Sequence, residues 1–435
     1  MCKAWRRKDS TMNYSVQDML QSVLDKAVAD ADVAGASVLV MQHGQERWYA
    51  QSGLRSIERN EPITRDTIFR LYSQSKPITG AAVMLLVERG IIDLVEPVSA
   101  YLPGFVGQVV HLDRNDTLSS GVPMQKNDDT GVAAGNADAI VEEPVQRAMT
   151  IRDLLTMTSG LVYPDATFEA GRITAKLFDE LGDRLYSDNP MGTVEFANRL
   201  GQLPLRFHPG SHWSYGTSAD VLGAVVEVAS GMRFGDFLQQ EFFGPLGMTD
   251  TSFFVPADKQ HRLVAAYDNP KDPVNAVNRG HVLREIRTDH LGIPYAADHA
   301  PAFESGGAGL RSTLDDYAKF GQMLINGGEL NGVRIFQPDT VRMMTTNGLK
   351  ESQRRDFSDW MPAHGYNALM DVAIEPGLAD ENCHLGEYGW GGWLGSYFCN
   401  DPTTGTTFLV MMQLTNSGTL PFIRKMKNIV WSHVS

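Results

Sequence analysis

Cysteine is scarce in this 435-residue chain, whose only three thiols are Cys2, Cys383 and Cys399. That number is far below the dense, even-numbered sets of the small secreted domains that disulfides hold together. We therefore expect packing to stabilise the fold. Positive charge is also in short supply, because 38 Lys and Arg face 52 Asp and Glu and leave a formal net charge of -14. This balance disfavours a surface that follows phosphates, so no nucleic-acid partner is expected.

Long apolar runs are missing as well. Charged residues make up 21% of the chain and interrupt its hydrophobic 43%, so no segment has the character of a membrane span. The basic stretch from Met1 to Met12 is not followed by the apolar run of about 7 to 15 residues that a secretory signal needs. These observations predict a flexible tail over 1–12, a cytoplasmic location and no membrane partner. The hydrophobic content still suffices for a sizeable core.

Apolar periodicity predicts helices and strands at both ends of the chain. From about Ser15 to Asp30 the apolar residues fall on one helical stripe, and Ser15 followed by Asp18 is typical of a capped helix start. Residues 36–41 and 46–51 are expected to form an antiparallel hairpin. Further elements are expected as strands at 67–72, 388–398 and 406–413 and as helices at 79–90, 151–158, 194–200, 217–229, 233–243, 314–326 and 420–431.

Two stretches, 109–150 and 268–309, show no sustained period, and we expect them to be irregular. Loops of this length often frame a binding cleft. Strands and helices at both ends with a helical middle indicate two lobes. The first would be an α/β lobe built from 13–110 together with 306–435, and the second a mostly helical lobe over 111–305. A site at their junction would draw residues from more than one segment.

The stretch Ser73-Gln74-Ser75-Lys76 lies where a predicted strand gives way to a helix. Residues three apart share a helix face, so the Lys76 amine could reach the Ser73 hydroxyl and activate it as a nucleophile. An unperturbed lysine, with a pKa of about 10.4, stays protonated at neutral pH, so this role requires burial or neighbouring cations. The alternative is a capped helix start, because roughly one such spacing is expected by chance.

Five stretches in chain order carry a wider pattern. They are Phe69–Thr79, Thr150–Leu161, Trp213–Thr217 leading into Asp220–Gly223, Glu304–Thr313, and Trp390-Gly391-Gly392. In this order they resemble the boxes of the serine β-lactamase and penicillin-binding-protein superfamily. Within it the chain is most similar to the class C β-lactamases and the family VIII carboxylesterases. The resemblance extends from about Asn13 to the C-terminus.

This resemblance implies an α/β fold of the β-lactamase and transpeptidase type, in which an antiparallel sheet is flanked by helices. It also implies a catalytic set of Ser73 as nucleophile with Lys76 and Tyr215 managing its proton. A tyrosine acts as a base only where a cation favours its phenolate or where the proton moves in a concerted step. By the family pattern the backbone N–H groups of Ser73 and Trp393 form the oxyanion hole. No metal or cofactor is implied.

The boxes depart from the lactamase pattern at two places. Thr217 stands where Asn or Ser is usual, which we expect to weaken one polar contact. The third box reads Trp390-Gly391-Gly392, the family VIII version, where lactamases have Lys-Thr-Gly to hold a substrate carboxylate. As substrate-binding residues, these three offer no charge, but the Trp390 indole can cover an apolar acyl or alcohol group. Neutral esters are therefore favoured over penicillins.

The sequence thus predicts a carboxylesterase that acts on a small-molecule ester of a small neutral acyl group. A β-lactamase, a D-amino peptidase or amidase, and an acyltransferase share the same boxes and stay open as alternatives. A β-lactam-binding module without turnover is less favoured, because all three catalytic residues are present. His208 and His212 have the spacing of two metal ligands on a helix, but Pro209-Gly210 breaks that helix, and we interpret both as polar loop residues.

Overall fold

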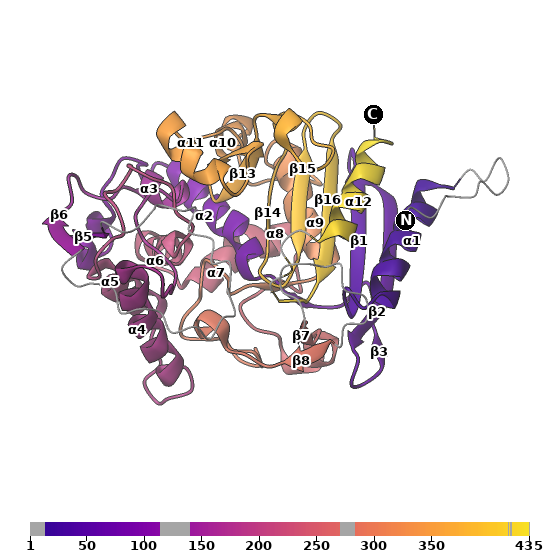
Figure 1. Ribbon diagram of the computed structural model, residues 1–435, viewed down its shortest axis with the longest axis horizontal. Helices are drawn as coiled ribbons and strands as arrows, with labels where there is room; N and C mark the ends of the chain where they lie inside the picture. Colours follow the sequence, from indigo (N-terminus) through magenta and orange to yellow (C-terminus); the bar gives the residue numbers. More distant parts are fainter. Residues whose placement is uncertain (1–13, 114–139, 270–282, 416, 418–419, 435) are drawn as a thin grey trace, which may run out of the picture.

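An eight-stranded sheet forms the centre of the computed structural model, which describes residues 14–113, 140–269, 283–415, 417 and 420–434 (Figure 1). In spatial order its strands are β12 (His364–Asn367), β13 (Met370–Ala373), β14 (Tyr388–Gly391), β15 (Tyr397–Asp401), β16 (Thr406–Met412), β1 (Gly35–Gln42), β2 (Gln45–Ser56) and β3 (Glu61–Pro62). All neighbouring strands are antiparallel. Because β1 pairs with β16, the two ends of the chain share one sheet.

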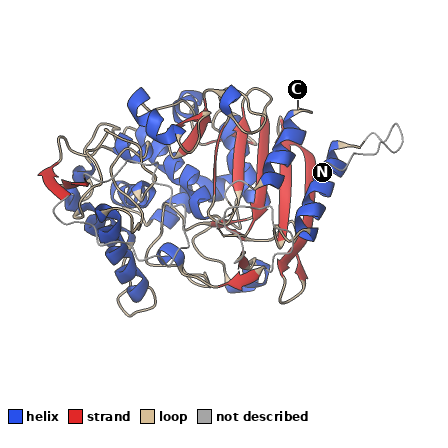
Figure 2. Cartoon of the chain, in the orientation of Figure 1, coloured by secondary structure: helices blue, strands red, loops and turns tan. Residues whose placement is uncertain are grey.

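Helices cover both faces of this sheet (Figures 1 and 2). On one face α1 (Val16–Ala29) packs against α12 (Pro421–Trp431), and a hydrophobic core lies between them and the strands. On the other face lie α9 (Leu314–Ile325) and α2 (Lys76–Glu88). The sheet flanked by helices that the sequence predicts is therefore confirmed.

The helix predicted near the N-terminus begins as its sequence indicates. Ser15 accepts a hydrogen bond from the Asp18 amide, and the Asp18 carboxylate accepts one from the Ser15 amide, which completes a capping box. The predicted hairpin is β1 and β2, which turn at His43 and Gly44.

The remaining helices gather around α2 and α6 (Ser218–Ser230), which contact each other. Every residue of α2 from Lys76 to Leu86 is buried, as is typical of a helix that is apolar all round. The others are α3 (Ile151–Leu155), α4 (Glu169–Arg184), α5 (Thr193–Gly201), α7 (Phe234–Leu238), α8 (Gly244–Leu246), α10 (Pro338–Met344) and α11 (Glu351–Ser358). None of the helices in the described ranges combines the length and apolarity needed to cross a bilayer.

Several elements differ from the sequence predictions. The predicted strand at 67–72 shrinks to β4 (Phe69–Arg70), since Tyr72 already begins a 3-10 turn. The predicted strand at 388–398 is two strands, β14 and β15, joined by a turn at Gly392. The helix predicted over 233–243 is α7 followed by a π-helical turn.

The first stretch expected to be irregular contains a strand pair, and the second contains one strand of another pair, whose partner ends at its first residue. The two pairs are β5 (Val109–Asp113) with β6 (Ile140–Pro144), and β7 (Ala266–Asp268) with β8 (Arg284–Ile286). In each stretch a segment that lies outside the described residues, 114–139 or 270–282, separates the partners. Local periodicity cannot report a pairing between segments that far apart.

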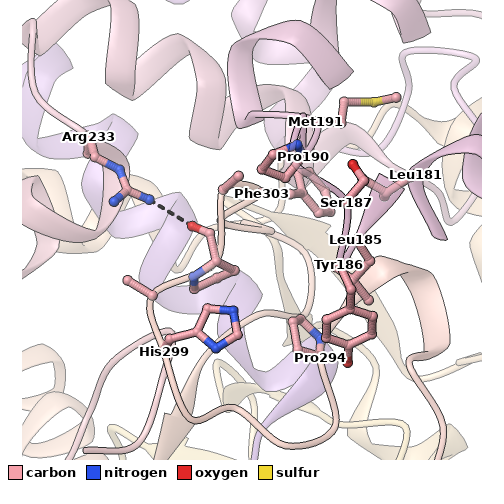
Figure 3. A pocket seen from close by; sticks show the side chains of 13 residues that line it. Leu181, Leu185, Tyr186, Ser187, Pro190, Met191, Arg233, Pro294, His299 and Phe303 are labelled. Carbon is pink, nitrogen blue, oxygen red and sulfur yellow. Dashed lines mark hydrogen bonds between the residues drawn. The ribbon is translucent and has the colours of Figure 1, made fainter. Parts of the chain in front are cut away.

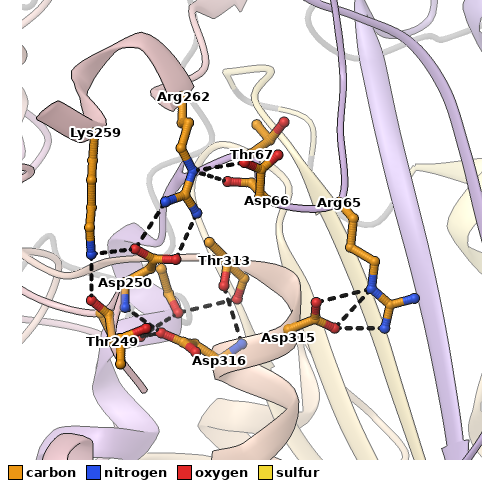
Figure 4. Close-up of polar contacts among 12 residues, drawn as sticks. Arg65, Asp66, Thr67, Thr249, Asp250, Lys259, Arg262, Thr313, Asp315 and Asp316 are labelled. Atoms are coloured by element: carbon orange, nitrogen blue, oxygen red, sulfur yellow. Dashed lines mark hydrogen bonds and ion pairs between the residues drawn. The ribbon is translucent and has the colours of Figure 1, made fainter. Parts of the chain in front are cut away.

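A polar network joins the loop before β4 to the start of α9 and to the segment after α8 (Figure 4). The Arg262 guanidinium contacts Asp250 at 2.6 Å and Asp66 at 3.1 Å. The Asp250 amide in turn donates to the carboxylate of Asp316 in the first turn of α9, at 2.6 Å. These contacts anchor the loop before β4, the strand that precedes the turn with Ser73.

Candidate active site

Ser73 lies in a 3-10 turn, η1 (Tyr72–Ser75), between β4 and α2. The preceding residue, Tyr72, has a backbone φ of 46°, a left-handed conformation that is strained for a residue with a large side chain. Its ring is buried and meets the edge of the Trp393 ring at a centroid distance of 4.9 Å. The tight turn leaves Ser73 partly accessible while its neighbours Tyr72 and Gln74 are buried.

Lys76 has no exposed side-chain surface, and its amine is fully engaged. Nζ donates to Ser73 Oγ at 3.2 Å, to the Tyr163 hydroxyl at 3.0 Å and to the Gly307 carbonyl at 2.9 Å. Three acceptors match the three N–H groups of an ammonium. The structure thus brings together the serine and lysine that the sequence pairs, with two further groups around the amine.

The sequence does not predict Tyr163 as a site residue. It stands two positions beyond the Thr150–Leu161 box, and that nearness to a box is the only signal for it in the sequence. Burial, with Asp220 and Tyr215 nearby, holds the pKa of the Tyr163 hydroxyl well above its usual value. Tyr163 is therefore a neutral hydrogen-bond partner of Lys76 at any physiological pH.

Tyr215 lies beside Tyr163, with its ring centroid 5.7 Å from that of Tyr163 and 4.7 Å from Lys76 Nζ. Its hydroxyl oxygen accepts a hydrogen bond from the Trp390 indole at 3.2 Å. That contact uses the oxygen and leaves the hydroxyl proton free to point elsewhere. The next residue, Gly216, is required here, because a Cβ would lie 2.1 Å from the Leu161 carbonyl oxygen.

A buried carboxylate supports the loop that faces Lys76. Asp220 accepts hydrogen bonds from Ser305 Oγ at 2.5 Å and from the Gly307 amide at 3.1 Å. Burial raises the pKa of Asp220, and the positive charge of Lys76 opposes that shift. Asp220 thereby fixes the backbone whose Gly307 carbonyl holds the lysine. Thr217 does not join this set, since its hydroxyl contacts the Val162 carbonyl at 3.5 Å.

The third box lies beside the turn that carries Ser73. A Cβ at Gly392 would be 2.2 Å from the Leu71 carbonyl oxygen, so only glycine allows this approach. The next residue, Trp393, stacks on His290 at a centroid distance of 4.1 Å. Its position next to η1 is compatible with an amide directed at Ser73, which stays a prediction.

Trp390 is buried, whereas the sequence analysis expects its indole to cover a substrate group. Only 4% of its surface is exposed, and it packs against Tyr366 at a ring distance of 5.1 Å. Its one polar atom is the N–H that donates to Tyr215. The indole therefore contacts Tyr215 directly, and its own contact with substrate stays a prediction, as it does for Gly391 and Gly392.

Two buried arginines hold the loop that carries His290. Arg70 donates to the Tyr295 carbonyl at 2.6 Å, and Arg311, its partner across the pair of β4 with β9 (Arg311–Ser312), donates to the Pro294 carbonyl at 2.6 Å. Burial lowers the pKa of both, to about 9 for Arg311. Burial also lowers the pKa of His290 to about 4, so this imidazole is neutral at pH 7.

A cavity of about 660 Å³ lies between the end of α4 and the loop at 294–303 (Figure 3). Its walls are mostly apolar, and the Arg233 guanidinium at its edge is already paired with the Pro301 carbonyl and the Glu304 carboxylate. None of its lining residues contacts Lys76. We therefore place the candidate active site at Ser73 and not in this cavity.

The two histidines considered as metal ligands each bind a carboxylate instead. His208 pairs with Glu143 at 2.8 Å and His212 with Asp356 at 3.0 Å. Across the described part of the chain, no group of three or more His, Cys, Asp or Glu side chains could hold a metal ion.

Comparison with known proteins identifies the family. The family model described as Beta-lactamase matches residues 20–426. The chain belongs to the Beta-lactamase family. It is 30% identical to "Esterase EstB" of Burkholderia gladioli over 426 residues, which cover 93% of this chain and 92% of that protein. The resemblance to the serine β-lactamase and penicillin-binding-protein superfamily is thus confirmed.

Two further similar proteins have acyl transfer in their names. "Monacolin J acid methylbutanoyltransferase" of Aspergillus terreus is 27% identical over 370 residues, covering 82% of this chain and 78% of that protein. Among solved structures, "EstCE1, a hydrolase with promiscuous acyltransferase activity" superimposes with a TM-score of 0.73. At 24% identity, over 96% of this chain and 98% of the other, it establishes the shared fold.

Proposed function

We propose that the protein is a serine carboxylesterase that cleaves esters of small neutral acyl groups through an acyl-enzyme on Ser73. The observation that carries this proposal is the buried Lys76 amine, 3.2 Å from Ser73 Oγ and in contact with the Tyr215 ring. A partly accessible hydroxyl beside a buried amine and a tyrosine is the arrangement that nucleophilic catalysis needs.

In the first half-reaction, Ser73 Oγ attacks the ester carbonyl carbon and its proton passes to the Tyr215 oxygen, which must be a phenolate beside the Lys76 ammonium to accept it. The amides of Ser73 and Trp393 would stabilise the resulting oxyanion. The tetrahedral intermediate then collapses, the bond to the alcohol oxygen breaks, and Tyr215 protonates the departing alcohol. The acyl group stays bound to Ser73 as an ester.

In the second half-reaction, water takes the place of the alcohol. Tyr215 accepts a proton from the water molecule as its oxygen attacks the acyl carbonyl, which reverses its earlier role. Collapse of the second intermediate returns the proton to Ser73 and releases the acid. No cofactor is needed for either step.

The neutral third box supports esters over β-lactams. A penicillin carboxylate would find an indole at Trp390 where lactamases have a lysine, so a charge-assisted contact worth roughly 1.5 to 3 kcal/mol is missing. A deficit near 2.7 kcal/mol corresponds to about a hundredfold in kcat/KM.

The test is a panel of p-nitrophenyl acetate and butyrate, nitrocefin and a D-Ala-D-Ala peptide. We expect kcat/KM for both esters to exceed that for nitrocefin by at least about a hundredfold, following the deficit above. If nitrocefin were the better substrate, another cation must replace the missing lysine, and the esterase proposal would be wrong.

Acyl transfer is a second candidate, favoured by the acyltransferase names among the relatives. It differs only in the second half-reaction, where an alcohol attacks the acyl-enzyme in place of water. Adding a primary alcohol to the p-nitrophenyl butyrate reaction distinguishes the two. A new butyrate ester formed at the expense of butyric acid supports transfer, and butyric acid alone supports hydrolysis.

A further inference from the structure

Trp360 is the exposed member of the group of rings around Tyr215. Its edge meets the Tyr215 ring at a centroid distance of 5.6 Å and the Trp390 ring at 5.3 Å. Trp390 and Trp213, which also contact Tyr215, are buried, whereas 36% of the Trp360 surface is accessible. A large apolar surface is thus open to solvent beside the proposed proton-transfer residue.

The fold holds this indole in place from two sides. Trp360 follows the last turn of α11, and its amide donates to the Phe357 carbonyl at 3.0 Å. The carboxylate of Asp356, in α11, accepts a hydrogen bond at 3.0 Å from the amide of Trp213. Trp213 lies two residues before Tyr215 in the chain. The segments that carry Trp360 and Tyr215 are therefore joined by the hydrogen bond between the Asp356 carboxylate and the Trp213 amide.

The proposed mechanism decides which part of an ester would meet this surface. Tyr215 must lie next to the alcohol oxygen, because it protonates that oxygen as the bond breaks. The group attached to the oxygen then extends past Tyr215 toward the accessible ring next to it. The acyl group, bonded to Ser73 through the carbonyl carbon, leaves the reaction centre in another direction.

We propose that Trp360 binds the alcohol portion of the ester and selects aryl alcohols over small alkyl alcohols. This inference rests on the proposed esterase function. A flat ring placed against the accessible indole gains an offset-stacked or edge contact, which a short alkyl group cannot make to the same extent. Trp360 is a specificity-determining residue in this role, since it touches the substrate without moving a proton.

The test compares wild type, Trp360→Ala and Trp360→Phe on 2-naphthyl acetate and ethyl acetate. Trp48→Ala is the matched control, because Trp48 is a partly buried tryptophan on β2, remote from Ser73. Each ratio compares two proteins on one substrate, so the intrinsic reactivity of the leaving group cancels. Thermal melting establishes that each variant is folded.

For Trp360→Ala we expect kcat/KM to fall about tenfold on 2-naphthyl acetate and less than about twofold on ethyl acetate, as loss of one aromatic contact predicts. Trp360→Phe should retain most of the aryl preference. Both esters give the same acetyl-enzyme, from which the alcohol has already left. The rate of acetyl-enzyme hydrolysis should therefore be unchanged in every variant.

An equal loss on both esters, or a changed rate of acetyl-enzyme hydrolysis, would overturn the inference and leave the esterase proposal standing. A wild-type protein that hydrolyses neither ester would overturn the esterase proposal and this inference with it. An unchanged preference in folded Trp360→Ala and Trp360→Phe would also show that the alcohol lies elsewhere.

Discussion

Replacing Tyr163 by phenylalanine removes one of the three acceptors of the Lys76 amine. The Tyr163 hydroxyl lies 3.0 Å from Lys76 Nζ, and the amine has no exposed surface through which water could replace it. Loss of a hydrogen bond to a charged group costs roughly 1.5 to 3 kcal/mol. If that loss falls on the transition state, kcat/KM for p-nitrophenyl acetate should drop by about 10- to 150-fold.

Tyr388→Phe is the control for this substitution. It removes the same atom from another buried tyrosine, whose hydroxyl is bonded to Asn400 at 3.0 Å on the central sheet. We expect Tyr388→Phe to alter thermal stability and leave kcat/KM within about twofold. A folded Tyr163→Phe protein that loses less than about threefold in kcat/KM would refute the reasoning, because Tyr163 would then not hold the amine during catalysis.

Two further predictions concern Lys76 and the partly buried His290. Lys76→Arg should be as inactive toward esters as Lys76→Ala, since the bulkier planar guanidinium cannot replace the compact ammonium among its three buried acceptors, and adding Tyr215→Phe to either should cost little more; substantial activity in Lys76→Arg would make the lysine merely structural. Burial holds the pKa of His290 near 4 in the folded protein against 6.5 unfolded, so the folded state resists protonation and stability is lost as pH falls from 6.5 toward 4. Melting temperature should therefore decline less steeply over that range in His290→Phe than in wild type. Part of the decline should stay, because the pKa of His364 is also lowered to about 4. Parallel curves for the two proteins would contradict this prediction.

The parts of the fold that the sequence predicts well are those with a local signal. The capped stripe of α1 and the hairpin of β1 and β2 are contiguous in the chain, and the structure confirms them. The sequence did not predict α4, whose buried face includes Ala170, Gly171 and Thr174. The same face also holds Leu177, Phe178 and Leu181 at helical spacing, so the sequence carries a signal for this helix that the prediction missed.

The residues of the candidate site also differ in whether the sequence carries a local signal for them. Ser73 and Lys76 are recognisable because their spacing is local, and Tyr215 because it belongs to a box of neighbouring residues. Tyr163 and Trp360 reach the site only through tertiary packing of separate segments, so no spacing in the sequence predicts them. The burial of Trp390 likewise depends on rings from other elements.

The central claim is that Ser73 carries the acyl group, and active-site labelling tests it most directly. Wild-type protein is treated with a serine-directed phosphonate and digested, and the adduct is located by mass spectrometry beside a Ser73→Ala sample. We predict one adduct per chain, on the peptide containing Ser73, with ester hydrolysis lost in proportion to labelling. Ser73→Ala should be folded, unlabelled and inactive. Labelling at another residue, or ester hydrolysis by the alanine variant, would contradict the account.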